Sequence, residues 1–326
     1  MIAIGRWGAG TFLLASVLIA SAQTAPSDPA RLLWRIQQAA ANSTYQGTMT
    51  VNSAGVVSSS RISHICDGRH RYERIEVLDG QARQLYRHND RLMTVWPQHR
   101  LAVLEREDPA ADFPSLPSSA GQRALDNYEL RSIGNDRIAG HEAEVLLLKP
   151  RDAHRFAQRL WAERKTGLLL RSDVLGPKGE LLESSSFIDL AIGGRPSPEI
   201  VTGPMKRLEG LRVLRPQVVA TQLEAEGWAL SRGVPGFALV SCVKRPLDVT
   251  AADEPAVQVL QSVFSDGLTH VSVFIEPYDA QRHKPIRTSI GAMNTLMNRQ
   301  GEWWVTVMGD VPMATVQQFE AMLQRR

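Results

Sequence analysis

The feature that most constrains the fold is a long series of short β-prone segments separated by turn dipeptides. Residues 45–51 (YQGTMTV) begin the series. Asp67-Gly68, Asp79-Gly80 and Asn89-Asp90 then lie between segments rich in Ile, Val, Leu, Tyr and Thr. Because such dipeptides form the turns of β-hairpins, this pattern predicts an antiparallel up-and-down sheet.

The series continues beyond residue 120. Further strands are predicted at residues 128–133, 143–149, 156–163, 168–174 and 181–189. Together these segments make about nine to eleven strands, more than a twisted sheet holds without curling. An amphipathic helix over residues 28–41, with Asp28 as N-cap and Pro29 at its first position, precedes the sheet and is expected to pack on it. We therefore predict an unclosed antiparallel β-barrel covered by helices.

A segment rich in glycine and proline divides the chain. Residues 192–205 have little to bury and are predicted to be a linker. The β-barrel domain then spans residues 23–191, and a smaller α+β domain spans residues 206–326. The second domain has predicted strands at 236–244, 257–264, 269–276, 289–296 and 303–308. Its terminal helix, residues 312–323, places Val316, Phe319 and Leu323 on one face.

The N-terminus predicts export. Arg6 precedes an apolar run over residues 11–19, and Ala20 and Ala22 then form a small-x-small cleavage site. The run is shorter than the roughly 20 residues needed to span a bilayer, which disfavours an uncleaved membrane anchor. We expect residues 1–22 to be a signal peptide, cleaved after Ala22, and the mature protein to act in the periplasm.

The distribution of charge disfavours nucleic acid as a partner, and the positions of the cysteines disfavour a disulfide. The net charge of +3 comes from basic residues spread among acidic ones, without a Lys/Arg block, so nucleic acid is not a predicted partner. The two cysteines, Cys66 and Cys242, fall in different predicted domains. Because a disulfide requires Cα atoms within about 7 Å, we expect two separate thiols.

The stretch ISHICDGRHRYER combines two histidines, a cysteine and two carboxylates, as a metal site would. With Asp67-Gly68 as a two-residue turn, Cys66 pairs with Arg69. His64 and Cys66 then share a face of the hairpin, and His70 lies on the other face. Zinc and copper require three or four converging ligands, so no metal is expected here.

The usual signatures of catalysis are missing from the sequence. It contains no Gly-x-Ser-x-Gly elbow, and the serine triplets at 58–60 and 184–186 have no ordered base near them in sequence. Gly193-Gly194 opens no predicted helix and therefore makes no phosphate loop. We predict a protein that is not an enzyme and needs no cofactor.

A curled, half-covered sheet has a concave apolar face that suits an acyl chain. Trp96, Trp161 and Phe187 are the candidates for lining such a lipid pocket, although aromatic residues at strand spacing equally fill cores. Residues 105–120 contain three prolines and no periodicity, and are predicted to be a long loop, either a gate or a solvated connection.

Several phrases along the chain resemble the MucB/RseB family of periplasmic negative regulators of the envelope-stress sigma factor. In the first domain they are NYEL (127–130), SIG (132–134), RIAG (137–140), WAE (161–163), TGL (166–168), RSDVL (171–175) and GELLE (179–183). In the second they are GF (236–237), KRPL (244–247) and SDGL (265–268), which leads into VSV (271–273). Their shared order extends over essentially the whole mature chain.

The resemblance implies a first domain similar to the lipoprotein carriers of the outer membrane. It implies binding to the periplasmic domain of a single-span anti-sigma factor, which shields that protein from the first protease of a degradation cascade. It further implies release when a lipid or lipopolysaccharide signal is bound. The alternative function is a periplasmic lipid or lipoprotein carrier or chaperone. The contact residues for the partner are not implied, and the sequence leaves open whether the protein is a homo-oligomer.

Overall fold

The computed structural model describes residues 28–106, 125–247 and 257–326. The predicted cleavage site at Ala20 and Ala22, and most of the predicted loop at 105–120, lie outside these residues. Glu105 and Arg106, the first residues of that loop, are the end of a strand. Within the described ranges, every helix is too short or too polar to cross a membrane.

The first domain is built on one large sheet. Its strands are β1 (Tyr45–Ser53), β2 (Val56–Cys66), β3 (Arg71–Val77), β4 (Gln84–His88), β5 (Arg91–Trp96), β6 (Leu101–Arg106), β7 (Tyr128–Ile138), β8 (His141–Pro150), β9 (Ala157–Glu163), β10 (Leu169–Leu175), β11 (Leu181–Ile192) and β12 (Arg212–Leu214). A 3-10 turn, η1 (Pro97–His99), joins β5 to β6.

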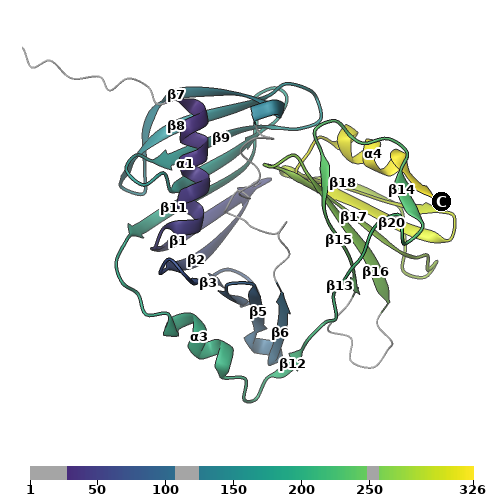
Figure 1. Ribbon diagram of the computed structural model, residues 1–326, viewed down its shortest axis with the longest axis horizontal. Coiled ribbons are helices and arrows are strands. Elements are labelled where there is room, and N and C mark those ends of the chain that lie inside the picture. Colours follow the sequence, from purple (N-terminus) through teal and green to yellow (C-terminus); the bar gives the residue numbers. More distant parts are fainter. Residues whose placement is uncertain (1–27, 107–124, 248–256) are drawn as a thin grey trace, which may run out of the picture.

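The twelve strands lie in the order β12-β6-β5-β4-β3-β2-β1-β11-β10-β9-β8-β7. Neighbours are antiparallel except β12, which runs parallel to β6. The edge strands β7 and β12 do not pair with each other, and they lie at opposite ends of the curled sheet (Figure 1). The predicted fold class, a mainly β protein with an unclosed sheet and a smaller second domain, is confirmed.

Helix α1 (Pro29–Asn42) covers one face of the sheet, which we call the α1 face. Asp28 caps the helix as predicted, because its side chain accepts a hydrogen bond from the backbone N–H of Ala30 at 3.1 Å. Leu32, Leu33 and Ile36 are fully buried. They pack against β7, β8 and β9 through Tyr128, Leu146, Leu148, Leu160 and Ala162.

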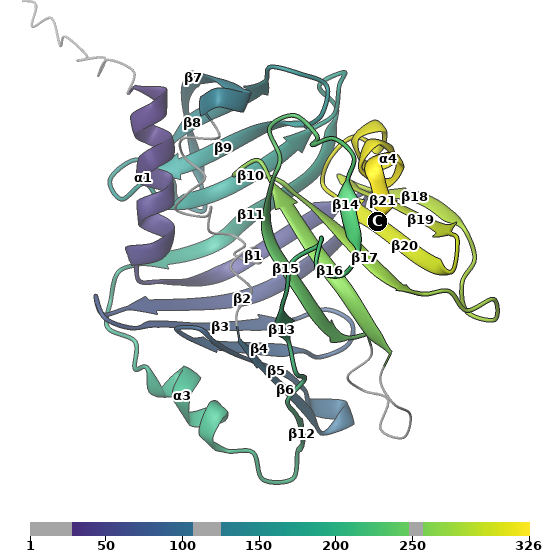
Figure 2. The ribbon, with the colours of Figure 1, turned by 45° about the vertical axis from the view of Figure 1, so that its right-hand side comes forward.

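Helix α3 (Glu199–Lys206) packs on the opposite face. His64 stacks on Tyr45 on the α1 face, so the next residue, Ile65, points to the other side. There Ile65 belongs to a cluster with Val201 of α3, which is 0% exposed. Figure 2 shows α3 beside the β3 to β6 end of the sheet, away from α1.

The predicted linker therefore differs from the structure. Half of residues 192–205 form the packed helix α3, and β12 extends the large sheet to Leu214. Only residues 215–218 connect the two sheets. The apolar spacing of Ile200, Val201 and Met205 was concealed by Gly203 and Pro204, which lie inside the helix.

The second domain is a smaller sheet with a helix on it. Its strands are β13 (Val219–Ala220), β15 (Ala238–Pro246), β16 (Gln258–Ser265), β17 (His270–Pro277), β18 (Ile286–Ile290), β19 (Met293–Gln300) and β20 (Trp303–Gly309), in the order β13-β15-β16-β17-β20-β19-β18. Helix α4 (Met313–Met322) contacts β19 and β20. A separate pair is formed by β14 (Trp228–Leu230) and β21 (Leu323–Arg325).

The core of the second domain confirms one prediction and corrects another. Val316 and Phe319 of α4 share the core with Leu323 as predicted, but Leu323 is the first residue of β21 and not the last of the helix. The predicted strand 289–296 is wrong, because it runs across the turn between β18 and β19. Gly291, at φ +58°, supplies the left-handed conformation of that turn.

The β2–β3 turn is shifted by one residue from its prediction. Cys66 pairs with Arg71 and not with Arg69. The reason is the Asp67 carboxylate, which accepts hydrogen bonds from the N–H groups of Arg69 at 2.9 Å and His70 at 2.7 Å. Asp67 is therefore the first residue of the turn, and Gly68, at φ +86°, is one of its central residues.

The two thiols lie on different sheets. Cys66 ends β2 and Cys242 lies in β15, where it is buried. They form no disulfide, so the predicted separate thiols are confirmed.

Candidate functional site

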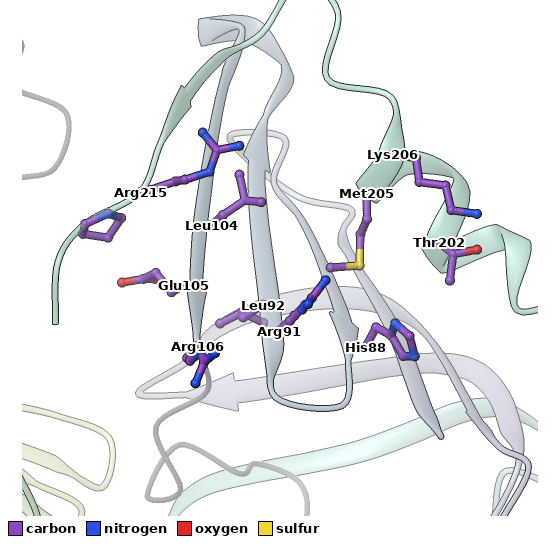
Figure 3. Close-up of a pocket in the computed structure, with 11 residues that line it drawn as sticks. His88, Arg91, Leu92, Leu104, Glu105, Arg106, Thr202, Met205, Lys206 and Arg215 are labelled. Atoms are coloured by element: carbon purple, nitrogen blue, oxygen red, sulfur yellow. The ribbon is translucent and has the colours of Figure 1, made fainter. Parts of the chain in front are cut away.

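A pocket of about 670 Å³ lies at the β6 edge of the large sheet, by which we mean the end of β6 beyond its pairing with β12 (Figure 3). One wall comes from β4, β5 and β6, a second from α3, and a third from the start of the connection between the sheets. The lining residues are His88, Arg91, Leu92, Leu104, Glu105, Arg106, Thr202, Met205, Lys206, Arg215 and Pro216. The size is typical of a small-molecule site.

The lining of the pocket is amphipathic, and most of its charged side chains are basic. Four of the lining side chains are basic, namely those of Arg91, Arg106, Lys206 and Arg215. Glu105 is the one carboxylate among the lining residues, and Arg245 of β15 pairs with it at 2.8 Å. Leu104 and Met205 connect the pocket with the apolar cluster under α3. Such a lining suits a ligand with an apolar chain and an anionic head group.

His88 contributes a neutral ring to the pocket. It stacks on Tyr72 with ring centroids 4.6 Å apart. Burial lowers the pKa of His88 below its usual 6.5, and the nearby charge of His70 lowers it further. Near pH 7 His88 is therefore uncharged, and the positive charge of the pocket comes from the arginines and the lysine.

The three aromatic residues predicted to line a lipid pocket are not brought together. Trp161 pairs with Arg171, and Arg171 pairs with Ser186, so these side chains share one face of the sheet. The next residue, Phe187, points to the α1 face and packs edge-on against Tyr45. The sheet therefore separates the side chains of Trp161 and Phe187.

Trp96 lies on the same face as Phe187, as the partners across β1 to β5 show. Strands β1, β2, β3 and β4 stand between the two residues. Trp96 is half-buried, whereas Phe187 is 4% exposed. Neither of them lines the 670 Å³ pocket, so a role in lipid contact stays a prediction for both.

Trp161 is enclosed by polar neighbours. The guanidinium groups of Arg159 and Arg171 lie 4.9 and 4.6 Å from its ring centroid. Its indole N–H donates to Asp136 at 2.9 Å. The fully buried carboxylate of Asp173 holds both arginines, at 2.9 and 2.8 Å. Trp161 also packs in an apolar cluster and is only 4% exposed, so its contacts lie within the protein.

The two histidines of ISHICDGRHRYER have structural partners within the protein. His64 is 3% exposed, stacks on Tyr45, and has Nδ1 at 2.7 Å from the Ser43 carbonyl oxygen. His70 lies in the β2–β3 turn beside Asn89. In the part of the chain that the structure describes, no three His, Cys, Asp or Glu side chains gather as metal ligands would.

A buried polar hub, which we define as Asp266, Arg155 and Tyr128, joins the two domains. Asp266 lies in the turn between β16 and β17 of the second domain, and the other two residues belong to the first. Arg155 Nε donates to Asp266 Oδ2 at 2.7 Å, and the Tyr128 hydroxyl donates to the same oxygen at 3.0 Å. Arg155 also donates to the Pro235 carbonyl oxygen at 2.9 Å.

The hub is the important interdomain site that sequence reasoning missed. Burial raises the pKa of Tyr128 well above 10, and the Asp266 charge raises it further, so the hydroxyl remains a donor. The motif SDGL, which includes Asp266, is one of the motifs that resemble the MucB/RseB family. The sequence alone does not reveal that Asp266 pairs with Arg155, because the two residues are 111 positions apart.

Two family descriptions match the chain. The MucB/RseB N-terminal domain matches residues 28–208, and the MucB/RseB C-terminal domain matches residues 222–324. The sigma factor AlgU regulatory protein MucB of Pseudomonas aeruginosa is 30% identical over 319 residues, which are 94% of this chain and 93% of that protein. The sigma-E factor regulatory protein RseB of Escherichia coli K12 is 24% identical over 311 residues, which are 95% and 94%.

Solved structures agree with the sequence relatives. MucB in complex with MucA(peri) aligns with a TM-score of 0.66 at 26% identity, over 92% of this chain and 99% of that chain. The complex structure of Pseudomonas aeruginosa MucA/MucB aligns with a TM-score of 0.69 at 26% identity, with the same two shares of 92% and 99%. Both domains and their order are therefore shared, and the chain belongs to the MucB/RseB family.

Proposed function

We propose that this protein binds the periplasmic domain of a single-span anti-sigma factor and thereby represses an envelope-stress response. The observation that carries the proposal is the similarity to MucB over both domains, because MucB has been solved in complex with MucA(peri). The alignment covers 99% of MucB in that complex, so the whole binding protein, and not one domain of it, has a counterpart here.

The connection between the domains supports a binding protein that uses both of them. The hub fixes the second domain on the first through a charge pair with 0% exposure on both sides. Thr315 at the start of α4 adds a hydrogen bond from its hydroxyl to the His154 carbonyl oxygen at 2.9 Å. A partner segment that contacts both domains then meets a preorganised surface, which lowers the entropy cost of binding.

A binding assay with purified components tests the proposal. The mature chain is titrated with the periplasmic domain of a single-span anti-sigma factor from the same organism, and binding is followed by calorimetry. We expect a one-to-one complex. If both proteins are folded and no heat of binding or co-elution is found, the proposed function is wrong. The periplasmic domain of an unrelated single-span protein serves as the negative control.

Protection from proteolysis is the second part of the proposal. A segment held against a folded protein is not free to extend into a protease cleft, so binding slows cleavage. We expect the first protease of the cascade to cut the free anti-sigma domain faster than the complex. Equal cleavage rates at saturating regulator would leave binding intact and would remove the protective role.

Sensing of a lipid or lipopolysaccharide signal is the third part. The cationic and apolar lining of the 670 Å³ pocket supports it, since this lining suits an acyl chain with an anionic head group. We expect an anionic single-chain lipid to bind and to release the partner. A simple carrier would also bind lipid, but it would transfer lipid or lipoprotein between vesicles, and we expect no such transfer.

The proposed function requires export. Cleavage after Ala22 would leave Gln23 as the first residue of the mature protein. Mass spectrometry of the protein from a periplasmic extract measures this directly. A full-length mass in that fraction would contradict the predicted cleavage.

A further inference from the structure

The pocket shares a wall with the connection between the two domains. Only residues 215–218 lie between the end of β12 and the start of β13, and two of them, Arg215 and Pro216, line the pocket. In Figure 3 the Arg215 side chain lies on the opposite side of the pocket from the α3 residues Thr202 and Lys206. A ligand in the pocket therefore touches the segment that must bend if the domains move.

A second contact ties the pocket to the second domain. Glu105 lines the pocket, and its Oε1 accepts a hydrogen bond from Nη2 of Arg245 in β15 at 2.8 Å. We call this ion pair the latch. Arg245 also donates to the Gln261 side chain at 3.4 Å, so its position is set by the second domain.

The latch is much easier to break than the hub. The latch side chains are 19% exposed for Glu105 and 33% exposed for Arg245, whereas Arg155 and Asp266 are 0% exposed. Exposed ion pairs contribute little stability, and breaking a buried pair leaves an uncompensated charge. If the domains separate, they therefore separate at the latch and pivot at the hub.

We propose that the pocket controls the latch: an anionic amphiphile bound there opens the Glu105–Arg245 pair and moves the second domain away from the β6 edge. This inference rests on the ligand-sensing part of the proposed function. Glu105 is the one carboxylate among the lining residues, and it follows Leu104 and precedes Arg106 at the end of β6, where the pocket reaches both faces of the sheet. A phosphate or carboxylate head group bound at this end of β6 therefore repels Glu105. The same head group attracts Arg245 away from Glu105.

The coupling between ligand binding and latch opening is reciprocal, so it can be measured as a change in ligand affinity. If ligand binding opens the latch, then a protein whose latch is already open binds the ligand more tightly, by the same factor. Coupling between two sites is commonly about 5-fold to 150-fold. The variant Arg245→Gln removes the latch without changing a lining residue, so its effect on affinity reports the coupling alone.

The experiment uses the full mature chain and lysophosphatidic acid as the probe. Affinity is measured for the wild type, Arg245→Gln and Lys244→Gln. Lys244 is the matched control, because it is the neighbouring cation of β15 and pairs with Glu226 inside the second domain. We expect Arg245→Gln to bind the probe at least about 5-fold more tightly than wild type and Lys244→Gln to match the wild type.

Small-angle X-ray scattering follows the domains in the same samples. The probe is expected to increase the radius of gyration of the wild type, and Arg245→Gln is expected to be expanded without probe. Lysophosphatidylcholine has the same chain with a zwitterionic head group, and inorganic phosphate has the anion alone. Both are expected to bind more weakly and to leave the scattering unchanged.

Several results would overturn the coupling. They are wild-type affinity in Arg245→Gln, unchanged scattering with saturating probe, equally tight binding of phosphate alone, or no binding of the probe. None of these results affects the calorimetric test with the anti-sigma domain, so failure of the coupling leaves partner binding standing. Conversely, if the latch responds to the probe but the protein does not bind the anti-sigma domain, the proposed partner binding is rejected and the coupling stands.

Discussion

At the residue scale, the two carboxylate oxygens of Asp266 accept hydrogen bonds from different partners. Oδ1 accepts hydrogen bonds from the backbone N–H groups of Leu268 and Thr269, both at 2.9 Å, and so closes the β16–β17 turn. Oδ2 accepts from Arg155 and Tyr128 of the other domain. One side chain therefore shapes a local turn and holds a distant domain, which explains its fully buried position.

Replacement of Asp266 tests this account. In Asp266→Asn the amide oxygen can still close the turn, but the amide nitrogen then faces the donors of Arg155 and Tyr128. We expect the free energy of unfolding to fall by about 3 to 5 kcal/mol, as for other broken buried ion pairs. Denaturant unfolding measures it. Glu105→Gln, at the partly exposed latch, should cost about 1 kcal/mol, and equal losses would contradict the distinction between hub and latch.

Glu163 gives a pH-dependent prediction at the same scale. Burial raises the pKa of this carboxyl, but hydrogen bonds from the N–H and hydroxyl of Thr166 and from the N–H of Lys165 outweigh burial and lower it below 4.5. The folded protein therefore favours the charged form. The stabilisation is complete above pH 4.5 and is lost as the pH falls below that value.

We expect Glu163→Gln to lower the free energy of unfolding at pH 7 by about 1 to 3 kcal/mol, the usual value of hydrogen bonds to a charged group. The difference from wild type should shrink between about pH 5 and pH 3. Denaturant midpoints across this range measure it. Glu142→Gln is the matched control, because the Glu142 side chain is 76% exposed. A difference that grows toward the acidic end of the range would contradict the sign.

At the scale of elements, the sequence predicted the features that depend on residues close together in the chain. Helix α1 begins where Asp28 and Pro29 indicate, and Asn89-Asp90 is the two-residue turn between β4 and β5. The β2–β3 turn was displaced because the Asp67 carboxylate, and not the dipeptide alone, sets the register. Helix α3 was missed because its stability comes from tertiary packing, which outweighs the poor helix propensity of Gly203 and Pro204.

The anchoring of α3 can be tested through Val201, which is fully buried against the sheet. Val201→Ala removes two methyl groups and leaves a cavity, so we expect a loss of about 2 to 3 kcal/mol in the free energy of unfolding. Val56→Ala makes the same chemical change at a side chain that is 70% exposed, and should be within about 0.5 kcal/mol of wild type. Similar losses at both positions would show that α3 is not held by burial.

At the scale of the whole molecule, the candidate site lay beyond what one sequence reveals. The pocket combines residues from β4 to β6, from α3 and from the connection, which are up to 128 positions apart between His88 and Pro216. The predicted aromatic residues failed to converge for a related reason. The face of each side chain depends on register across several strands, and a bulge in β10 opposite β9 shifts that register.

The placement of the two domains depends on a glycine as well as on the hub. Gly236 has φ +79°, and a Cβ atom there would overlap Nη2 of Arg155 and the side-chain oxygen of Asn127. Gly301 has a similar φ of +62°, but a Cβ atom there would meet no other atom within 4 Å. Alanine at either position incurs the same backbone strain of about 1 to 2 kcal/mol, but only alanine at 236 displaces Arg155 from the hub.

We therefore expect Gly236→Ala to loosen the domains and Gly301→Ala to leave them in place. Limited proteolysis at residues 215–218 measures this, because a connection between separated domains is cut faster than one held in a pocket wall. Cleavage there should accelerate several-fold in Gly236→Ala and stay at the wild-type rate in Gly301→Ala. Equal acceleration in both variants would assign the effect to backbone strain, and unchanged cleavage in Gly236→Ala would show that the hub tolerates the displacement of Arg155.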